Sequence, residues 1–308
     1  IGPIAHGGHF IARHNNQVIF VRHAITDESA KVKITHIDKR LAFGDAVEIL
    51  KPSKDRVKPP CQHSKPNGCG GCDFQHISIE MQKKFKEFII KDQFSRIAQI
   101  DINPIVLSAE PYSGLNWRTR LNLAVSDKGR VGLYSHKSSQ IFEIEKCLIA
   151  VEKINDSNIF NQKWNDKDRL NISVSSENII TISQGGKIIM GPNELNEKVG
   201  EDQYIISPES FWQSHKNAPK LLAQQVIKNA GIKLGDKVCD LYGGAGLFTL
   251  PIWPRPDKIP RLRVVFPAPK SPCNVTTKPG LMNFDTRLPR AMVSTSSATS
   301  SLTAAKLC

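Results

Sequence analysis

Three cysteines crowd into residues 61–72, and this cluster constrains the fold more than any other feature of the chain. Cys69 and Cys72 flank two glycines, whose backbone freedom allows a tight turn that aims both sulfurs inward. The total of seven cysteines is odd, and residues 1–20 lack the basic head and apolar run of a secretory signal. Disulfides are therefore not expected, and the cluster predicts a bound metal with Cys61, Cys69 and Cys72 as ligands.

A fourth soft ligand has to come from elsewhere in the chain. Cys147 is the only other cysteine before residue 239, so it is the candidate. Zinc and iron–sulfur clusters both take four protein thiolates, and the spacing alone leaves the choice between them open. Cys239 falls in an apolar run and is interpreted as a small core residue.

The charge balance points to a polyanionic partner. Lys plus Arg number 42 against 29 Asp plus Glu, which leaves a net charge of +13. With 308 residues, 40% of them hydrophobic, the chain is globular in class and has room for two domains. No stretch approaches the roughly 18 uninterrupted apolar residues of a spanning helix, so we expect a cytoplasmic protein without a membrane partner.

Residues 253–308 differ in composition from the rest of the chain. They hold eight of the 19 prolines and supply +7 of the net charge of +13. They end in a Ser/Thr/Ala run, 294–305, that has neither helical nor strand period and cannot bury enough apolar surface to fold. One interpretation is a natural basic tail that contacts nucleic acid. The other, which we prefer, is sequence foreign to the preceding 252 residues.

The first 55 residues have the pattern of a small β-barrel. Short β-type runs at 18–21, 32–37 and 46–50 are separated by polar turns, which is typical of closely spaced strands. A linker rich in Lys and Pro, 51–60, leads from them to Cys61.

The segment after the cysteine cluster predicts one helix followed by several strands. Ser78 is a helix N-cap for a predicted helix over 78–98, with Met81, Phe85, Phe88 and Ile89 on its core-facing side. Residues 116–125 alternate like a strand, with Arg118, Arg120 and Asn122 on one face. The two arginines are either a solvated edge or a phosphate contact. Further strands are predicted at 131–134, 140–144, 171–174 and 179–182.

The last patterned region predicts the start of a nucleotide-binding α/β unit. A helix is expected from Asn217 to a stop at Gly231, then a buried strand over 237–242, then a glycine loop over 243–246. The loop lacks the third glycine of a dinucleotide fingerprint, which argues against NAD.

Taken together, the motifs of residues 3–252 resemble one family, the bacterial RNA uridine-5-methyltransferases, especially the iron–sulfur type that modifies 23S ribosomal RNA. The loop Asp240-Leu-Tyr-Gly-Gly-Ala-Gly246 looks like the first motif of class I methyltransferases. The resemblance also rests on the segments 4–21, 117–120, 132–138 and 211–217 and on the spacing of Cys61, Cys69, Cys72 and Cys147. The turn at 26–28 and the longer spacing between Gln213 and Asn217 depart from the family pattern.

The resemblance implies an α/β plus β fold in four parts. These are a TRAM or OB-like RNA-binding barrel (1–55), a central α+β domain with the iron–sulfur site (56–205), a truncated Rossmann-like methyltransferase domain (206–252) and the atypical tail (253–308). It implies a 4Fe-4S cluster on the four cysteines and RNA contacts by Arg118 and Arg120. It also implies a monomer that binds S-adenosylmethionine and RNA, ribosomal rather than transfer RNA. The donor-binding residues would be Gln213, Asp240, Tyr242, Gly243, Gly244 and Gly246.

The catalytic residues of the family are not found in these 308 residues. Relatives carry an Asp-Pro-Pro-Arg-type loop, a Ser-Cys-Asn-Pro nucleophile loop and a carboxylate base after the glycine loop. Cys273, in Ser271-Pro-Cys273-Asn274, echoes the nucleophile loop but follows Gly246 too closely. We therefore expect no catalytic residue in the chain as given and no methyl transfer by it. The alternatives are a non-catalytic RNA-binding iron–sulfur protein and a transfer-RNA uridine-5-methyltransferase.

Overall fold

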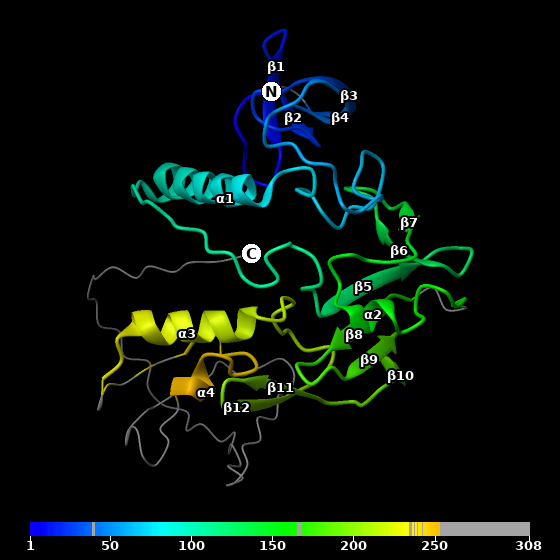
Figure 1. Ribbon diagram of the computed structural model, residues 1–308, viewed down its shortest axis with the longest axis vertical. Coiled ribbons are helices and arrows are strands. Elements are labelled where there is room, and N and C mark those ends of the chain that lie inside the picture. Colours follow the sequence, from blue (N-terminus) through cyan, green and yellow to red (C-terminus); the bar gives the residue numbers. More distant parts are fainter. Residues whose placement is uncertain are drawn as a thin grey trace. The chain divides into compact units, whose positions relative to one another are not determined.

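The computed structural model describes residues 1–252 except 39–40, 165–167, 234–235, 237, 239 and 242 (Figure 1). All described residues belong to one compact unit, Ile1–Val275. The atypical tail, 253–308, lies outside the described residues, as does Cys273. In the described part of the chain, no helix has the length and apolar character needed to cross a membrane.

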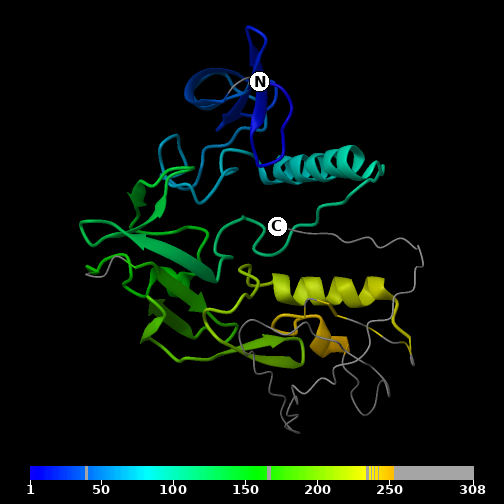
Figure 2. The same cartoon turned by 180° about the vertical axis from the view of Figure 1, so that it is seen from behind.

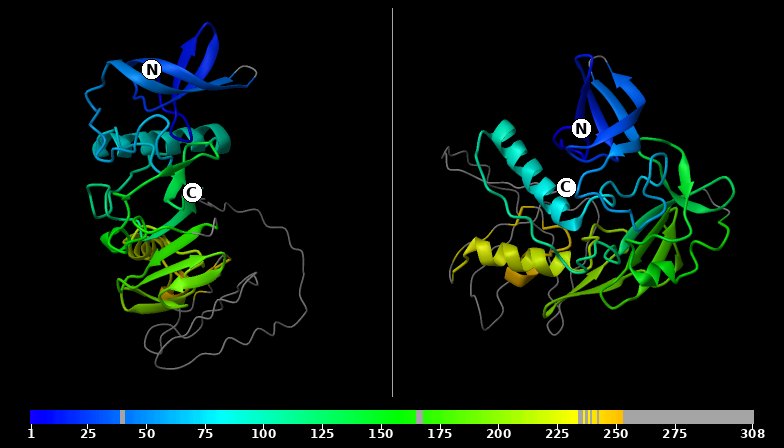
Figure 3. Two further views of the ribbon diagram at one scale, coloured as in Figure 1. Left: turned by 90° about the vertical axis from the view of Figure 1, so that its right-hand side faces the viewer. Right: turned by 45° about the horizontal axis from the view of Figure 1, so that its top comes forward.

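The first four strands form a single sheet, which we call the N-terminal sheet. Its strands are β1 (Phe10–His14), β2 (Gln17–Arg22), β3 (Ser29–Asp38) and β4 (Leu41–Lys51), in the spatial order β1-β2-β4-β3. β2 and β4 are parallel, and the register between β3 and β4 shifts at three places. Such bulges bend and twist a strand, and the strands curl in the right-hand view of Figure 3. The three predicted strands are confirmed as parts of longer ones, in a four-stranded sheet where we expected a barrel.

A buried ion pair fixes the turn between β2 and β3. The Glu28 side chain is fully buried and accepts hydrogen bonds from the backbone N–H groups of Ile25 (2.9 Å) and Ser53 (3.0 Å). The Arg56 guanidinium donates a further bond of 2.7 Å to Glu28. Burial opposes ionisation of the carboxyl, but Arg56 and the backbone donors outweigh it and hold the pKa of Glu28 below its usual value. The start of the linker after β4 is thereby tied to the N-terminal sheet.

The predicted helix begins where its cap was expected. α1 (Ile79–Gln93) starts after Ser78, whose side chain accepts from Met81 N, and it ends in a π-helical turn, η1 (Phe94–Ala98). Met81, Phe85 and Ile89 pack on a small core that includes Phe10 of β1. Phe88 was also expected in that core, but it is 48% exposed. The residues that make contact are spaced by four, and Phe88 lies at the edge of their stripe.

The central sheet is antiparallel and holds the largest core. Its order is β10-β9-β8-β5-β6-β7, and it is green in Figure 1. The elements are β5 (Arg120–Val125), β6 (Val131–Tyr134), β7 (Ile141–Glu143), α2 (Glu152–Asn155), β8 (Leu170–Val174), β9 (Ile180–Gln184) and β10 (Lys187–Met190). Leu123, Leu170 and Ile182 are fully buried in it, each worth roughly 1.5–3 kcal/mol of transfer free energy. The predicted strands at 131–134, 140–144, 171–174 and 179–182 are confirmed within two residues.

The last described elements surround a second, smaller core. They are the hairpin of β11 (Leu195–Val199) and β12 (Asp202–Ile206), then α3 (Ala218–Ala230) and α4 (Thr249–Ile252), seen from behind in Figure 2. α3 ends at Gly231, whose φ of 59° is the left-handed cap conformation that the sequence predicted. Ala223 of α3 packs with Tyr204 of the hairpin and with Leu247 after the glycine loop.

The strand expected over 237–242 is not seen. Val238, Asp240 and Leu241 lie in no strand, and the remaining three positions lie outside the described residues. A strand needs a partner for its backbone groups, and the nearby hairpin pairs only with itself among the described residues.

Candidate functional site

Three of the four predicted cysteine ligands, Cys69, Cys72 and Cys147, lie at the core of the central sheet. Cys61, Cys69 and Cys72 come from the loop before α1, and Cys147 from the segment between β7 and α2. Cys69 and Cys72 pack against the core to which the buried Cys147 belongs. Gly70 allows this approach because a side chain there would meet Tyr134 O at 2.5 Å, and its N–H donates to that carbonyl over 3.1 Å.

Three of the four thiols resist ionisation because they are buried. Burial raises the pKa of Cys72 to about 11 and also raises those of Cys69 and Cys147. These three thiols are therefore protonated at neutral pH, and a metal that binds them has to displace protons.

Donors to sulfur are already in place around these thiols. The Gly71 N–H donates to Cys69 Sγ over 3.4 Å, and backbone N–H groups of Ile149 and Ala150 favour the charged form of Cys147. Such donors suit thiolate ligands of a cluster. Across the described ranges, however, no group of three or more His, Cys, Asp or Glu side chains is arranged to hold a metal ion. The donor chemistry therefore fits a thiolate-bound cluster, while the side chains are not closed around a metal.

Two side chains that the sequence analysis missed hold this cysteine site. The Asn155 amide accepts from Cys147 N (3.0 Å) and donates to Cys147 O (3.1 Å), so α2 clamps the backbone at that cysteine. Gln75 accepts from Cys61 N over 3.1 Å and hydrogen-bonds the Cys72 thiol. Only the three-residue spacing between Cys72 and Gln75 is visible in the sequence, and it is not distinctive.

The glycine loop lies on the smaller core. Gly246 N donates to Gly243 O over 2.7 Å, and both Gly244 (φ 53°) and Gly246 (φ 81°) adopt the left-handed conformation that favours glycine. The Asp240 carboxylate accepts from the Thr249 hydroxyl over 2.7 Å, which joins the two ends of the loop. Tyr242, also predicted in this site, lies outside the described residues.

Gln213 lies next to a residue of the same core. Thr119 donates from both its backbone N–H (2.7 Å) and its hydroxyl (3.0 Å) to Ser214 O, which fixes the residue after Gln213 beside the entry to β5. The residue before it, Trp212, is buried in the core that contains Leu247. Trp212, next to Gln213, and Leu247, next to the glycine loop, therefore belong to one core.

The two arginines predicted to contact RNA have different surroundings. The side chain of Arg120 is 12% exposed, and its Nη1 donates to Pro208 O (2.9 Å) and Ser210 O (3.0 Å). Its Nη2 lies 4.0 Å from Glu197, and burial lowers the pKa of Arg120 while Glu197 raises it. Arg118 is half-buried, and its guanidinium carbon lies 6.0 Å from the Trp117 ring centre. Arg120 therefore anchors the segment that leads to Gln213, and Arg118 donates from Nε to Arg120 O over 2.9 Å.

Comparisons with known proteins agree with these parts. A model of the TRAM domain matches residues 1–47. An uncharacterized RNA methyltransferase of Streptomyces coelicolor is 32% identical, over 80% of this chain and 63% of the relative. Another from Streptomyces avermitilis is 33% identical, over 80% of this chain and 67% of the relative. The chain thus spans about two thirds of the length of these relatives.

A solved structure shares the fold at lower identity. It is the tRNA (uracil-54, C5)-methyltransferase of Pyrococcus abyssi in complex with S-adenosyl-L-homocysteine, with a TM-score of 0.55 and 18% identity. The match covers 79% of this chain and 69% of that one. With the TRAM match and the two streptomycete relatives, the conclusion is that this chain belongs to the RNA methyltransferase family.

Proposed function

We propose that this protein serves the S-adenosylmethionine-dependent formation of 5-methyluridine in RNA, with 23S ribosomal RNA as the substrate. The observation that supports the proposal is the combination, in one chain, of a TRAM-matched sheet, three cysteines packed at the core of the central sheet, and a glycine loop whose neighbour Leu247 shares a core with Trp212, the residue before Gln213. Ribosomal RNA is preferred over transfer RNA because the cysteine set and the TRAM domain resemble the ribosomal members. The protein acts as a monomer in the cytoplasm.

Donor binding falls to the residues on the smaller core. S-adenosylmethionine supplies an electrophilic methyl group on sulfur. Gly243, Gly244 and Gly246 let the backbone approach the methionine part of the donor, and Gln213 and Asp240 supply polar contacts. Tyr242, which lies outside the described residues, corresponds in sequence to an aromatic residue that lines the donor site in the family.

The reaction needs a nucleophile because C5 of uracil is unreactive alone. A cysteine thiolate adds to C6, the electron pair moves onto C5, and C5 takes the methyl group from sulfur. A base then removes the C5 proton, and the thiolate leaves C6. The target base has to be unpaired to meet both groups.

A second candidate follows from the cysteine inventory of the 308 residues. Cys61, Cys69, Cys72 and Cys147 are proposed to hold a 4Fe-4S cluster, which would tie the loop before α1 to the central sheet. The other three are Cys239, Cys273 and Cys308, and none stands in the family's nucleophile motif. The chain as given then binds RNA without methylating it.

A competition experiment tests the choice of RNA. The full chain, purified without oxygen, is bound to a labelled, unmodified 23S ribosomal RNA fragment and challenged with unmodified transfer RNA or with the same fragment unlabelled. We expect the unlabelled fragment to displace the label at much lower concentration than transfer RNA. Equal displacement would contradict the ribosomal assignment, and better displacement by transfer RNA would support the transfer-RNA alternative.

A further inference from the structure

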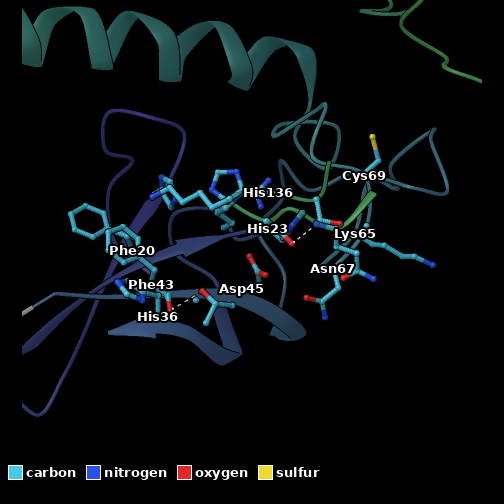
Figure 4. Close-up of a pocket in the computed structure, with 18 residues that line it drawn as sticks. Phe20, His23, His36, Phe43, Asp45, Lys65, Asn67, Cys69 and His136 are labelled. Carbon is cyan, nitrogen blue, oxygen red and sulfur yellow. Dashed lines mark hydrogen bonds between the residues drawn. The ribbon is translucent and has the colours of Figure 1, made fainter. Parts of the chain in front are cut away.

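A cavity of about 600 Å³ lies between the N-terminal sheet and two loops that follow it in the chain (Figure 4). The sheet contributes Phe20, Phe43 and His36, and the loops contribute Lys65, His136 and Lys137. The predicted RNA contacts Arg118 and Arg120 are not among its lining residues. We call it the N-terminal pocket, and its volume falls in the range of pockets that take small ligands.

An aromatic group forms one end of this pocket. The Phe20 and Phe43 rings stack, with centres 5.4 Å apart and planes 21° from parallel. The His9 ring meets both edge-on, at 6.1 and 6.0 Å, and His36 lies 6.1 Å from Phe43. Figure 4 shows Phe20, Phe43 and His36 together, with Lys65 and Asn67 at the other end of the view. Half-exposed aromatic rings of this kind are platforms on which bases stack.

The cations around the pocket differ in availability. Arg22 is bound to Asp73 over 2.7 Å and is buried, so it is part of the framework. Lys65 and Lys137 are exposed, and neither makes an ion pair within the part of the chain that the structure describes. The Lys137 ammonium lies over the Phe43 ring, 4.5 Å from its centre. Two exposed ammonium groups beside an aromatic platform suit the phosphates that flank a stacked base.

Neutral hydrogen-bonding groups complete the lining. Burial, His136 and Arg22 hold the pKa of His9 at about 4, and burial and Arg22 do the same for His23. A neutral imidazole presents one donor and one acceptor, as the edge of a base does. The buried side chain of Asp45 adds two further oxygen atoms to the lining. The pocket therefore combines stacking, edge recognition and phosphate contacts.

We propose that the N-terminal pocket binds one unpaired nucleotide of an RNA strand, with its base on Phe43 and its phosphates at Lys137 and Lys65. The proposal rests on the proposed function, since it takes RNA as the substrate. On binding, the base displaces the Lys137 ammonium from the ring, and the ammonium pairs with phosphate. Single strands are therefore bound more tightly than duplexes, because a paired base cannot reach the ring.

Fluorescence anisotropy of a short single-stranded RNA and of a matched duplex tests the proposal on the full chain. Phe43→Ala should weaken single-strand binding by about tenfold and leave the salt dependence unchanged. Lys137→Gln should lower the log–log salt slope by about 0.7. The matched controls are Phe88→Ala, an exposed aromatic of α1, and Lys187→Gln, an exposed lysine of β10, and neither should change binding. The proposal would be overturned if Phe43→Ala and Lys137→Gln bound single-stranded RNA as tightly as the two control variants do. It would also be overturned if the wild type bound single strand and duplex with equal affinity.

A crosslinking experiment covers the case in which Phe43→Ala does not fold. Wild-type chain is irradiated with single-stranded RNA that contains 4-thiouridine, and the labelled peptides are sequenced. We expect labelling of peptides that contain Phe43 or His136, and labelling confined to other peptides would overturn the proposal. So would displacement of the RNA by a phosphopeptide of equal charge at equal concentration. Failure of the wild type to bind any RNA would overturn the proposed function too, whereas binding without the Phe43 effect would overturn the pocket alone.

Discussion

The N-terminal sheet with its cysteine loop (residues 1–77) and the region from β11 to α4 (195–252) are held together by different forces. In the first, polar contacts with at least one buried partner join distant segments: Glu28 with Arg56, Arg22 with the 46% exposed Asp73, and His76 Nε2 with Ala24 O at 3.0 Å. Each of these contacts has a definite geometry, because a buried charge without its partner is costly. The pocket of the N-terminal sheet is therefore shaped before any ligand binds.

The second region is held mainly by apolar packing, although polar contacts such as the Thr249–Asp240 hydrogen bond of 2.7 Å also occur in it. Seven of its described residues are buried in the core, and the side chains of Leu221, Val226, Ile227 and Leu241 remain 38–61% exposed. The Tyr204 hydroxyl adds one long hydrogen bond to Leu247 O, 3.3 Å. The comparison indicates that polar contacts between distant segments organise the first region, whereas the second is organised mainly by its apolar core. The predictions below test this contrast, from the largest expected effect to the smallest.

Cys69→Ala should abolish the proposed cluster. Loss of one of four thiolates leaves an iron site open, so anaerobically purified variant should hold almost none of the wild type's iron and lose its brown colour. Cys239→Ser, outside the predicted ligand set, is the control and should keep both. Iron and zinc analysis of the purified proteins measures this. A colourless wild type with one zinc per chain would contradict the cluster assignment.

Arg56→Met should lower the free energy of unfolding by about 3 kcal/mol. The substitution leaves the Glu28 carboxylate buried without its cation, which is the costly way to break such a pair. Lys31→Met removes one partner of the exposed Lys31–Glu48 pair in the same sheet and should cost less than about 1 kcal/mol. Urea denaturation of both variants gives the difference. If both variants lose the same free energy of unfolding, the buried Glu28–Arg56 pair does not contribute more to stability than the exposed Lys31–Glu48 pair.

Acid should weaken the N-terminal sheet through His9 and His23. Their pKa values are lowered from 6.5 to about 4 on folding, so below pH 6.5 the unfolded chain binds protons that the folded chain does not. Their contribution is fully present above pH 6.5 and is lost as the pH falls toward 4, roughly 1 kcal/mol for each by pH 5 after allowance for solvent screening. The double variant with His9→Gln and His23→Gln should therefore lose less stability between pH 7 and pH 5 than the wild type. Identical losses would contradict the neutral state of these imidazoles.

Arg118→Ala and Arg120→Ala should have different effects, although the sequence places both on one strand face. If Arg118 contacts phosphate, its loss lowers the log–log salt slope of RNA binding by about 0.7. Arg120→Ala should instead reduce thermal stability, because Pro208 O and Ser210 O lose their donor. Salt titrations and melting curves distinguish the two. If Arg118→Ala leaves both the RNA affinity and its salt slope unchanged, Arg118 does not contact phosphate and its side chain is merely solvated.

Features set by local chemistry could be predicted from the sequence. Ser78 starts α1 and Gly231 ends α3, since a cap needs only the neighbouring turn. Cys147 was predicted as the fourth ligand because it is the only other cysteine before residue 239, and the family resemblance implied the same set; that ligand set stays a prediction.

Features that depend on distant partners could not be predicted. The burial of Glu28 depends on Arg56, 28 residues later, and the burial of Arg120 on carbonyls at 208 and 210. The N-terminal pocket joins residues near 9–45, 65–69 and 135–140, and no periodic pattern in the sequence links them. β1, β10, β11 and β12 were also missed, because their short mixed sequences carry little strand signal.

The central proposal is that this member of the RNA methyltransferase family binds RNA through the 308 residues given, and that none of the cysteines in these residues stands in the family's nucleophile motif. Transfer of labelled methyl from S-adenosylmethionine to unmodified 23S ribosomal RNA tests it directly, with RNA binding measured in the same samples and Cys273→Ser alongside. We predict that the RNA is bound and remains unlabelled with both proteins. Turnover by the chain that Cys273→Ser abolishes would contradict this account and identify Cys273 as the nucleophile.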